Sequence, residues 1–377
     1  MSDVRFMRLA LRLARRGCGA TSPNPMVGAV LVKGGKIIGR GWHRRAGLPH
    51  AEIEALRDAQ KLGHNPRGAV LYVTLEPCCT HGRTPPCTDA IISAGIKRVV
   101  VGATDPNPKH AGKGFKILRG VGIEVVHGIL SDECERLNEA FNHWIVRRTP
   151  FVTVKAAMTL DGKIATAGGE SKWITGEKAR AHGMKLRQGS DAILAGVNTI
   201  LADNPSLTFR AAKSPKSKVQ NRKQLRRIVL DSMARTPLNA KVVGDEFTAL
   251  TTIVASKLAP KNRVARLAKR ANVLVAPSRN GKIDLRWLMK KLGSENVASI
   301  LVEGGGEVNA SFLLGGFAQR VAFFYAPKIL GGRDSRKAVA GDGAKSLSEV
   351  IQLQEIEWNK IGADLLMTAL VANGRKK

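Results

Sequence analysis

The chain has 377 residues, enough for two domains of ordinary size, and 44% of them are hydrophobic, which supports two buried cores. Sixty-one lysines and arginines against 30 acidic residues give a net charge of +31, so we expect a strongly hydrated basic surface and sites for phosphate-bearing ligands. The few aromatic residues do not alternate with basic ones as in a base-stacking platform, so nucleic acid is not the expected partner.

The cysteine content and the amino-terminus indicate the compartment. Five cysteines, three of which cluster at 78, 79 and 87, are more typical of a metal site in a reducing compartment than of a disulfide framework. No apolar run is long enough to span a membrane, and the amino-terminus lacks the apolar core of a secretory signal. The arginine-rich start also has the apolar spacing of an amphipathic helix, which favours a domain helix over a transit peptide. We therefore expect a cytoplasmic protein.

The first 147 residues alternate between predicted helices and predicted strands. Strands are expected at 27–32, 36–41, 69–75 and 97–102, with a Gly34-Gly35 hairpin turn between the first two. Helices are expected at 4–16, from His50, from Pro86-Cys87 and at 131–147. This alternation predicts a three-layer α/β domain that ends at the charged stretch before Pro150. His43 is interpreted as a surface residue.

One motif within this domain indicates a metal site. His50-Ala51-Glu52 is followed by Pro77-Cys78, which agrees with the first part of the zinc-deaminase signature H-x-E…P-C-x-x-C. The second part differs, because His occupies position 81 and the next Pro-Cys pair is Pro86-Cys87. The alternative is a chance set of buried cysteines and a histidine at a helix start. The order of the residues, with proline before each cysteine, argues against chance.

The second half, 150–371, contains a different kind of site. The apolar strand expected at 299–302 leads into Gly304-Gly305-Gly306 and a predicted helix. Backbone N–H groups at such a helix start bind phosphate, and glycine allows close approach. The pattern is not G-x-G-x-x-G, so a Rossmann site is not predicted, and a plain glycine turn is the alternative. Residues 211–226 are expected to form an exposed basic loop, and 372–377 a basic tail.

The run from His50 to Cys87, with extra residues between its cysteines, resembles the deaminase half of the bifunctional riboflavin-biosynthesis deaminase/reductase family. The segments 151–163, 169–175, 196–205, 207–210, 227–232, 299–309 and 325–332 together resemble its reductase half. The resemblance implies a cytidine-deaminase-like three-layer α/β/α domain at 1–147 and a dihydrofolate-reductase-like α/β domain at 150–371. It also implies a homo-oligomer.

The same resemblance implies two reactions on a small phosphorylated pyrimidine. The first is zinc-dependent hydrolytic deamination of 2,5-diamino-6-(5-phosphoribosylamino)pyrimidin-4-one, in which zinc (Zn2+) lowers the pKa of water. The second is NADPH-dependent reduction of the ribosyl group, which gives 5-amino-6-(5-phosphoribitylamino)uracil.

The resemblance also implies the site residues. Zinc would bind His50, Cys78 and Cys87, with Glu52 as the acid/base and Cys79 as a bystander. Substrate contacts are implied for Asn24, Arg83, Asp105, Asn107, Lys155, Ser171, Arg187, Leu207, Arg210 and Glu303. NADPH contacts are implied for Ala157, Trp173, Thr199, Asp203, Ser232, Gly305, Gly306, Glu307, Val308 and Asn309.

Three alternative functions remain open from the sequence. The first is a nucleic-acid-directed zinc deaminase with a basic binding surface, which the charge favours but the second domain and the lack of an aromatic platform oppose. The second is an enzyme with one active half, although the residues of both halves are in place. The third is a non-catalytic basic binding protein on an enzyme fold, which should bind zinc poorly.

Overall fold

The computed structural model describes residues 3–81, 85–209 and 225–372. The chain divides into two compact units, Met1–Arg148 and Thr149–Lys377. Within the described ranges, no helix has both the length and the apolar character needed to cross a membrane.

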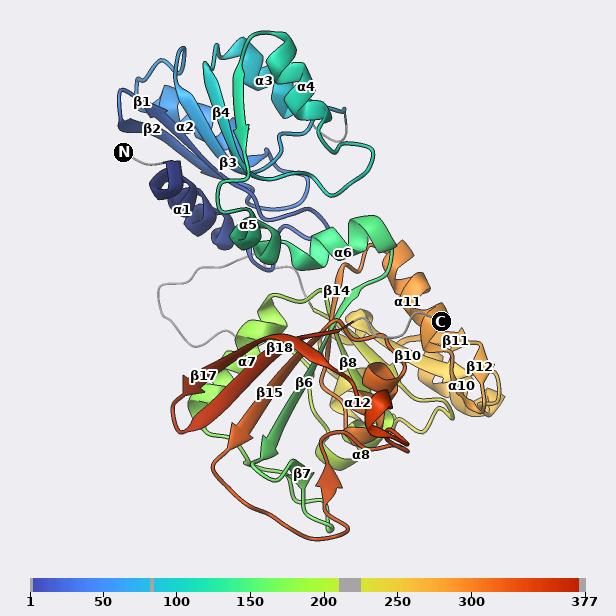
Figure 1. Ribbon diagram of the computed structural model, residues 1–377. Coiled ribbons are helices and arrows are strands. Elements are labelled where there is room, and N and C mark those ends of the chain that lie inside the picture. Colours follow the sequence, from blue (N-terminus) through green and yellow to red (C-terminus); the bar gives the residue numbers. More distant parts are fainter. Residues whose placement is uncertain (1–2, 82–84, 210–224, 373–377) are drawn as a thin grey trace. The chain divides into compact units, whose positions relative to one another are not determined.

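The first unit contains a five-stranded sheet with helices on its two faces (Figure 1). The strand order is β2-β1-β3-β4-β5, in which β1 runs antiparallel to β2 and β3 and the remaining pairs are parallel. The strands are β1 Gly28–Lys33, β2 Lys36–Trp42, β3 Val70–Leu75, β4 Arg98–Ala103 and β5 Glu124–His127. The helices are α1 Asp3–Ala14, α2 Ala51–Lys61, α3 Cys87–Ser93, α4 Lys113–Gly120, α5 Ser131–Leu137 and α6 Glu139–Arg147, with a 3-10 turn η1 Arg15–Gly17.

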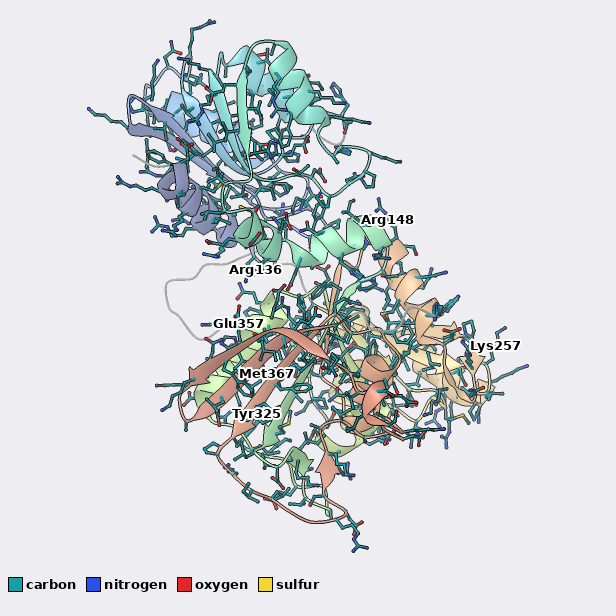
Figure 2. All side chains as sticks on the ribbon, in the orientation of Figure 1. Arg136, Arg148, Lys257, Tyr325, Glu357 and Met367 are labelled. Carbon is teal, nitrogen blue, oxygen red and sulfur yellow. The ribbon has the colours of Figure 1, made fainter. Side chains whose placement is uncertain are left out.

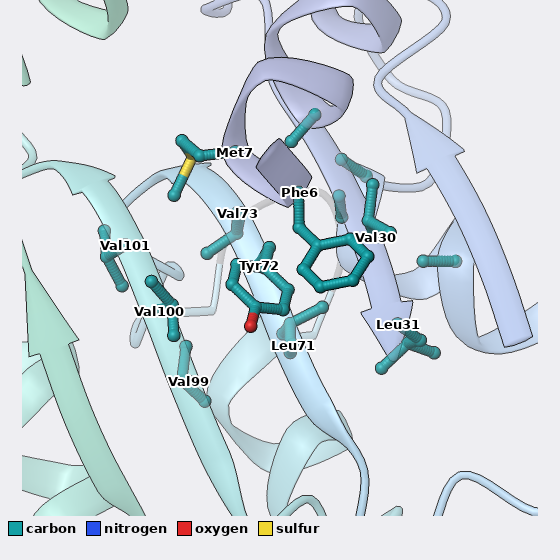
Figure 3. Close-up of a cluster of buried hydrophobic side chains, with 14 of the residues drawn as sticks. Phe6, Met7, Val30, Leu31, Leu71, Tyr72, Val73, Val99, Val100 and Val101 are labelled. Atoms are coloured by element: carbon teal, nitrogen blue, oxygen red, sulfur yellow. The ribbon is translucent and has the colours of Figure 1, made fainter. Parts of the chain in front are cut away.

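Glycine allows two helices to approach this sheet closely. A Cβ on Gly28 would lie 2.0 Å from the carbonyl oxygen of Ala10 in α1, and one on Gly41 would lie 2.2 Å from that of Ala51 in α2. Figure 3 shows the core beneath α1, where the rings of Phe6 and Tyr72 lie 5.0 Å apart. The close approach at Gly41 holds the start of α2 against the end of β2.

The expectation of one helix over 131–147 is wrong, because the helix is interrupted at Asn138. The buried Asn138 amide accepts a hydrogen bond from the N–H of Met26 at 2.8 Å and donates one to its carbonyl at 2.9 Å. This side chain ties the helix junction to the segment before β1. The first helix also ends earlier than predicted, at Ala14.

The second unit contains a nine-stranded sheet of order β11-β10-β9-β8-β14-β6-β15-β18-β17 (Figure 1). Neighbouring strands from β11 to β15 are parallel, and β18 and β17 complete the sheet as an antiparallel hairpin. The strands are β6 Phe151–Thr159, β8 Ala192–Gly196, β9 Arg226–Leu230, β10 Thr251–Ser256, β11 Asn272–Ala276, β14 Ser299–Val302, β15 Arg320–Ala326, β17 Leu353–Ile361 and β18 Asp364–Val371.

Helices and short elements connect these strands. The helices are α7 Glu177–Gln188, α8 Val197–Asp203, α9 Lys241–Gly244, α10 Lys261–Ala268, α11 Leu285–Ser294 and α12 Gly306–Leu314. The short elements are β7 Lys163–Ala165 paired with β16 Arg336–Lys337, β12 Ser278–Arg279 paired with β13 Lys282–Ile283, and the 3-10 turns η2 Thr248–Leu250 and η3 Leu347–Glu349.

The order of the central strands determines where a ligand can bind. Strand β14 lies between β8 and β6; the chain leaves β8 toward β9 on one side and leaves β14 toward β15 on the other. Such a switch point opens a crevice at the carboxyl ends of the strands, where ligands bind in open α/β sheets.

Candidate active sites

Three side chains of the first unit converge on one point. His50 is the residue before α2, Cys87 is the first residue of α3, and Cys78 follows β3. The Nδ1 atom of His50 lies 3.4 Å from the Cys78 sulfur and 3.3 Å from the Cys87 sulfur. Tetrahedral zinc with two sulfur ligands and one nitrogen ligand has edges of about 3.5 Å, so the donor set fits zinc and leaves a position for water.

Hydrogen bonds divide the charge between the two cysteines. Bonds from the Cys87 thiol, from His50 and from the Cys87 N–H outweigh burial and lower the pKa of Cys78 well below its ordinary value. The bond to Cys78, together with burial, raises the pKa of Cys87. Cys78 is therefore the thiolate of the pair, and a bound metal would hold both sulfurs deprotonated. Among the described residues, Cys79 does not belong to the cluster.

Glu52 lies in the first turn of α2 beside the cluster. Its side chain is 3% exposed. Burial, and then the negative charge on Cys78, raise the pKa of Glu52 to about 7. A carboxyl group with this pKa can accept and release a proton near neutral pH, as a general acid/base must.

A second histidine that the sequence did not single out lies beside His50. The expectation of a surface position for His43 is wrong, since it is 2% exposed and its ring meets that of His50 edge-on at 5.3 Å. Its Nδ1 lies 3.1 Å from the Pro49 carbonyl and donates to it, so its Nε2 accepts from the Asn24 amide at 3.2 Å. His43, whose ring contacts that of His50, thereby orients the Asn24 amide.

The loop after β4 carries two more of the predicted residues. Asp105 accepts a hydrogen bond from the N–H of Asn107 at 2.8 Å. Burial raises the pKa of Asp105, and the nearby charges on Glu76 and Cys78 raise it further, while the Asn107 N–H and His110 act against this rise. Arg83 lies outside the described residues. Glu76, which the sequence did not single out, holds this loop through its carboxylate.

The second unit has a cleft of about 1560 Å³ formed by residues of β6 and by the segments that follow β8 and β14. Its lining includes the predicted residues Lys155, Ala157, Ser171, Trp173, Arg187, Thr199, Asp203, Leu207, Glu303, Gly305, Gly306, Glu307 and Val308. Ser232 and Asn309 are not among its lining residues, and Arg210 lies outside the described ranges. The segment 335–337, together with 339–344, also lines the cleft and was not predicted.

The three glycines after β14 have three different surroundings. A Cβ on Gly304 would lie 2.6 Å from the Val308 Cβ, and one on Gly306 would lie 2.3 Å from the Lys337 carbonyl oxygen. Among the residues that the structure describes, a Cβ on Gly305 would meet only the Thr199 hydroxyl, at 3.9 Å. Gly305 therefore borders open space at the start of α12, a cradle that fits a phosphate of a dinucleotide.

Asn309 and Ser232 make contacts within the fold. The fully buried Asn309 amide donates to the Ala338 carbonyl at 2.8 Å and so anchors the 335–344 segment against α12. The Ser232 carbonyl accepts from the N–H of Ser256 at 3.0 Å and from its hydroxyl at 2.8 Å. Asn309 therefore supports a segment that lines the cleft, whereas Ser232 is bonded to the last residue of β10.

An ion cluster forms one wall of the cleft. The Arg187 guanidinium binds both Glu303 oxygens, at 2.8 and 2.9 Å, and also donates to the Thr208 carbonyl at 2.8 Å. The Lys155 ammonium lies 3.7 Å from Glu303. Two cations against one carboxylate leave a net positive charge, so the wall favours an anionic ligand even though Arg187 is already paired.

The comparisons with known proteins agree with both sites. Residues 1–103 match the cytidine and deoxycytidylate deaminase zinc-binding region, and residues 150–367 match the RibD C-terminal domain. Fold and sites thus define a zinc-binding deaminase joined to a dihydrofolate-reductase-like, NADPH-dependent reductase.

Whole-length relatives extend this class to a particular family. The riboflavin biosynthesis protein RibD of Actinobacillus pleuropneumoniae is 43% identical over 373 residues, covering 98% of this chain and 96% of that protein. The RibD of Escherichia coli (strain K12) is 40% identical over 375 residues, covering 97% and 99%. The structure of Acinetobacter baumannii RibD, form 1, is 34% identical with a TM-score of 0.86, covering 98% and 99%.

The Thermotoga maritima structure described as a diaminohydroxyphosphoribosylaminopyrimidine deaminase/5-amino-6-(5-phosphoribosylamino)uracil reductase is 35% identical, with a TM-score of 0.82 over 98% of this chain and 99% of that one. The chain belongs to the RibD family of bifunctional deaminases and reductases of riboflavin biosynthesis. The expected fold class, the two activities and the two cofactors are confirmed.

Proposed function

We propose that the two sites act in series on one phosphorylated pyrimidine. The deaminase unit replaces the amino group of 2,5-diamino-6-(5-phosphoribosylamino)pyrimidin-4-one by an oxygen from water and releases ammonia. The reductase unit then adds hydride to C1′ of the ribosyl group, which gives 5-amino-6-(5-phosphoribitylamino)uracil. One observation carries this proposal. The same chain contains a His-Cys-Cys cluster beside a buried glutamate and a cleft with open space at a glycine before a helix.

In the deaminase site, a zinc ion, when bound, would lower the pKa of a water molecule. Glu52 accepts the proton from the water and passes it to the leaving nitrogen, a role that its pKa of about 7 supports. Asn24, held by His43, orients the pyrimidine, and Asp105 and Asn107 contact the ribosyl side. The ligands proposed for zinc are His50, Cys78 and Cys87.

In the reductase site, NADPH supplies the hydride, and the chain binds and orients both reactants. The open space at Gly305 and the N-terminus of α12 receive a phosphate of the cofactor, beside Thr199. On the substrate side, the net positive wall around Glu303 attracts the ribose phosphate, and Lys155 stabilises negative charge that develops at the reacting end.

We further propose a cytoplasmic homo-oligomer. All five cysteines lie in the described ranges and none of them forms a disulfide, which suits a reducing compartment. Ile356 and Trp358 on the edge strand β17 are 52% and 59% exposed, and exposed apolar side chains on an edge strand favour pairing with a second copy.

The test is NADPH consumption by zinc-loaded protein given the diamino substrate, beside the Glu52→Gln variant. The wild-type protein should release ammonia and then consume NADPH. The variant should consume NADPH only when it is given substrate that is already deaminated. A wild-type protein that consumes no NADPH even with deaminated substrate would contradict the reductase assignment.

A further inference from the structure

One buried carboxylate links the metal-binding segment to the loop after β4. Glu76 follows β3, lies two residues before Cys78, and is 5% exposed. Its carboxylate accepts hydrogen bonds from three backbone N–H groups, those of Asp105 at 3.2 Å, Gly112 at 3.0 Å and Gly114 at 2.9 Å.

The three N–H donors lie at the two ends of the loop after β4 and in the first turn of α4. Asp105 begins the loop 105–112 and Gly112 ends it, so one carboxylate oxygen binds both ends. Gly112 is also the residue before α4, and Gly114 lies in its first turn. Glu76 thus closes the loop and caps α4, whose own capping residue has no side chain to do so.

The packing around this contact leaves little freedom. A Cβ on Gly114 would lie 2.5 Å from the Pro77 carbonyl oxygen and 3.1 Å from a Glu76 carboxylate oxygen. The N–H of Glu76 also donates to the Ala103 carbonyl at 2.9 Å, which joins the ends of β3 and β4. A charged group this deeply buried is costly unless it is fully hydrogen-bonded, and here three N–H groups compensate it.

We propose that Glu76 is a positioning residue for the deaminase reaction. It holds the loop that carries Asp105 and Asn107 in register with Cys78, so it sets the affinity for the substrate more than the rate of the reacting step. This inference rests on the proposed function, in which Asp105 and Asn107 contact the ribosyl side of the pyrimidine substrate.

Two variants of the full-length, zinc-loaded protein test the contact from both partners. Glu76→Gln keeps the size but places an NH2 group against N–H donors, and Gly114→Ala pushes α4 away from Pro77. Each should raise the deaminase KM at least about tenfold and change kcat by less than about threefold, since charge-assisted hydrogen bonds in the substrate-binding loop are lost. Zinc content and the reductase rate on deaminated substrate should not change.

Glu124→Gln is the matched control, because this β5 carboxylate in the same unit is 59% exposed and pairs with Arg98. Its deaminase kinetics should equal those of the wild-type protein. An unchanged KM in Glu76→Gln would overturn the proposal. A variant that loses zinc, kcat and thermal stability together would also overturn it, because that result would indicate a role in folding alone.

Hydrogen exchange of residues 104–114 gives a readout that does not depend on turnover. These amides should exchange faster in Glu76→Gln than in the wild-type or the Glu124→Gln protein, and equal rates would overturn the proposal. If the wild-type protein released no ammonia, the deaminase assignment would fail on its own, and the exchange rates would still decide whether Glu76 holds the loop.

Discussion

The carboxyl groups of Glu52 and Glu303 are both largely shielded from solvent, yet their pKa values are shifted in opposite directions. Burial and the charge on Cys78 raise the pKa of Glu52 to about 7. Burial also raises that of Glu303, but the cations Lys155 and Arg187 outweigh it and lower the pKa to about 2. Glu52 can therefore exchange a proton at neutral pH, whereas Glu303 stays charged as the partner of two cations.

We predict that Glu303→Gln destabilises the second unit by about 3 kcal/mol at pH 7, because two cations lose their buried counter-charge. The folded pKa of Glu303 is depressed, so its stabilisation is complete above the ordinary value of 4.5 and is lost as the pH falls toward about 2. The difference in the free energy of unfolding between the wild-type protein and the variant should therefore become smaller as the pH falls from 4.5 toward about 2, which denaturant unfolding at each pH measures. Glu295→Gln is the control, since this carboxylate is 34% exposed beside Arg226 and should cost less than about 1 kcal/mol.

Zinc content separates the ligand cysteines from their neighbour. Cys87→Ser should lose zinc, because a thiolate that completes the His-Cys-Cys set is replaced by a poorer ligand. Cys79→Ser should keep about one zinc ion per chain and the deaminase activity. Elemental analysis of the dialysed proteins measures this, and zinc loss in the Cys79 variant would show that the ligand set differs.

At the scale of elements, the chemistry depends on helix starts placed against strand ends. His50 and Cys87 lie 3.3 Å apart because the N-termini of α2 and α3 lie next to each other. In the second unit, α12 begins at the switch point of the sheet, between β8 and β6. Helix N-termini favour anions, so one suits a metal-bound anion and the other a cofactor phosphate.

Gly305 and Gly306 should respond differently to the same substitution. Gly305→Ala should fold normally but raise the KM for NADPH about tenfold, because its Cβ would enter the cradle beside Thr199. Gly306→Ala should lower the stability of the second unit, because its Cβ would lie 2.3 Å from the Lys337 carbonyl. Thermal unfolding and NADPH titration together measure both effects. Equal stability of the two variants would contradict this assignment of the glycines.

At the scale of the whole molecule, the positive charge is unevenly distributed. Residues 251–298 contain eleven lysines and arginines and only two acidic residues. Both acids are engaged, since Asp284 caps α11 and Glu295 binds Arg226 and Lys291. Lys257, labelled in Figure 2, is one of the exposed cations in this edge of the nine-stranded sheet. Repulsion among them opposes the compact state.

We predict that sodium chloride stabilises this protein. Raising its concentration from about 0.01 M to about 0.15 M shortens the Debye length from about 30 Å to about 8 Å and screens the repulsion. The melting temperature should rise by about 2–4 °C, the shift that corresponds to about 1 kcal/mol. Scanning calorimetry in chloride avoids the phosphate and sulfate ions that could bind at the sites. A melting temperature that falls with salt would show that attractive ion pairs dominate.

The amino-acid sequence alone predicts the two-part organisation, the His-x-Glu and Pro-Cys motifs and the strand-glycine-helix segment, because these are local patterns. Patterns of this kind depend on residue type and spacing within a few turns of chain. They placed the elements that carry both sites, and the family resemblance supplied the residue assignments.

Features that depend on residues far apart in the chain became visible only in the folded structure. His43 is buried because Asn24 and Pro49 satisfy its ring, and the helix expected at 131–147 is interrupted because Asn138 binds Met26. The separate surroundings of Gly305 and Gly306 depend on Thr199 and Lys337, which lie far away in the chain. Glu76 likewise has its partners some 30 residues later. The spacing of residues along the chain does not predict such contacts, because they form only when distant segments pack and hydrogen-bond in the folded protein.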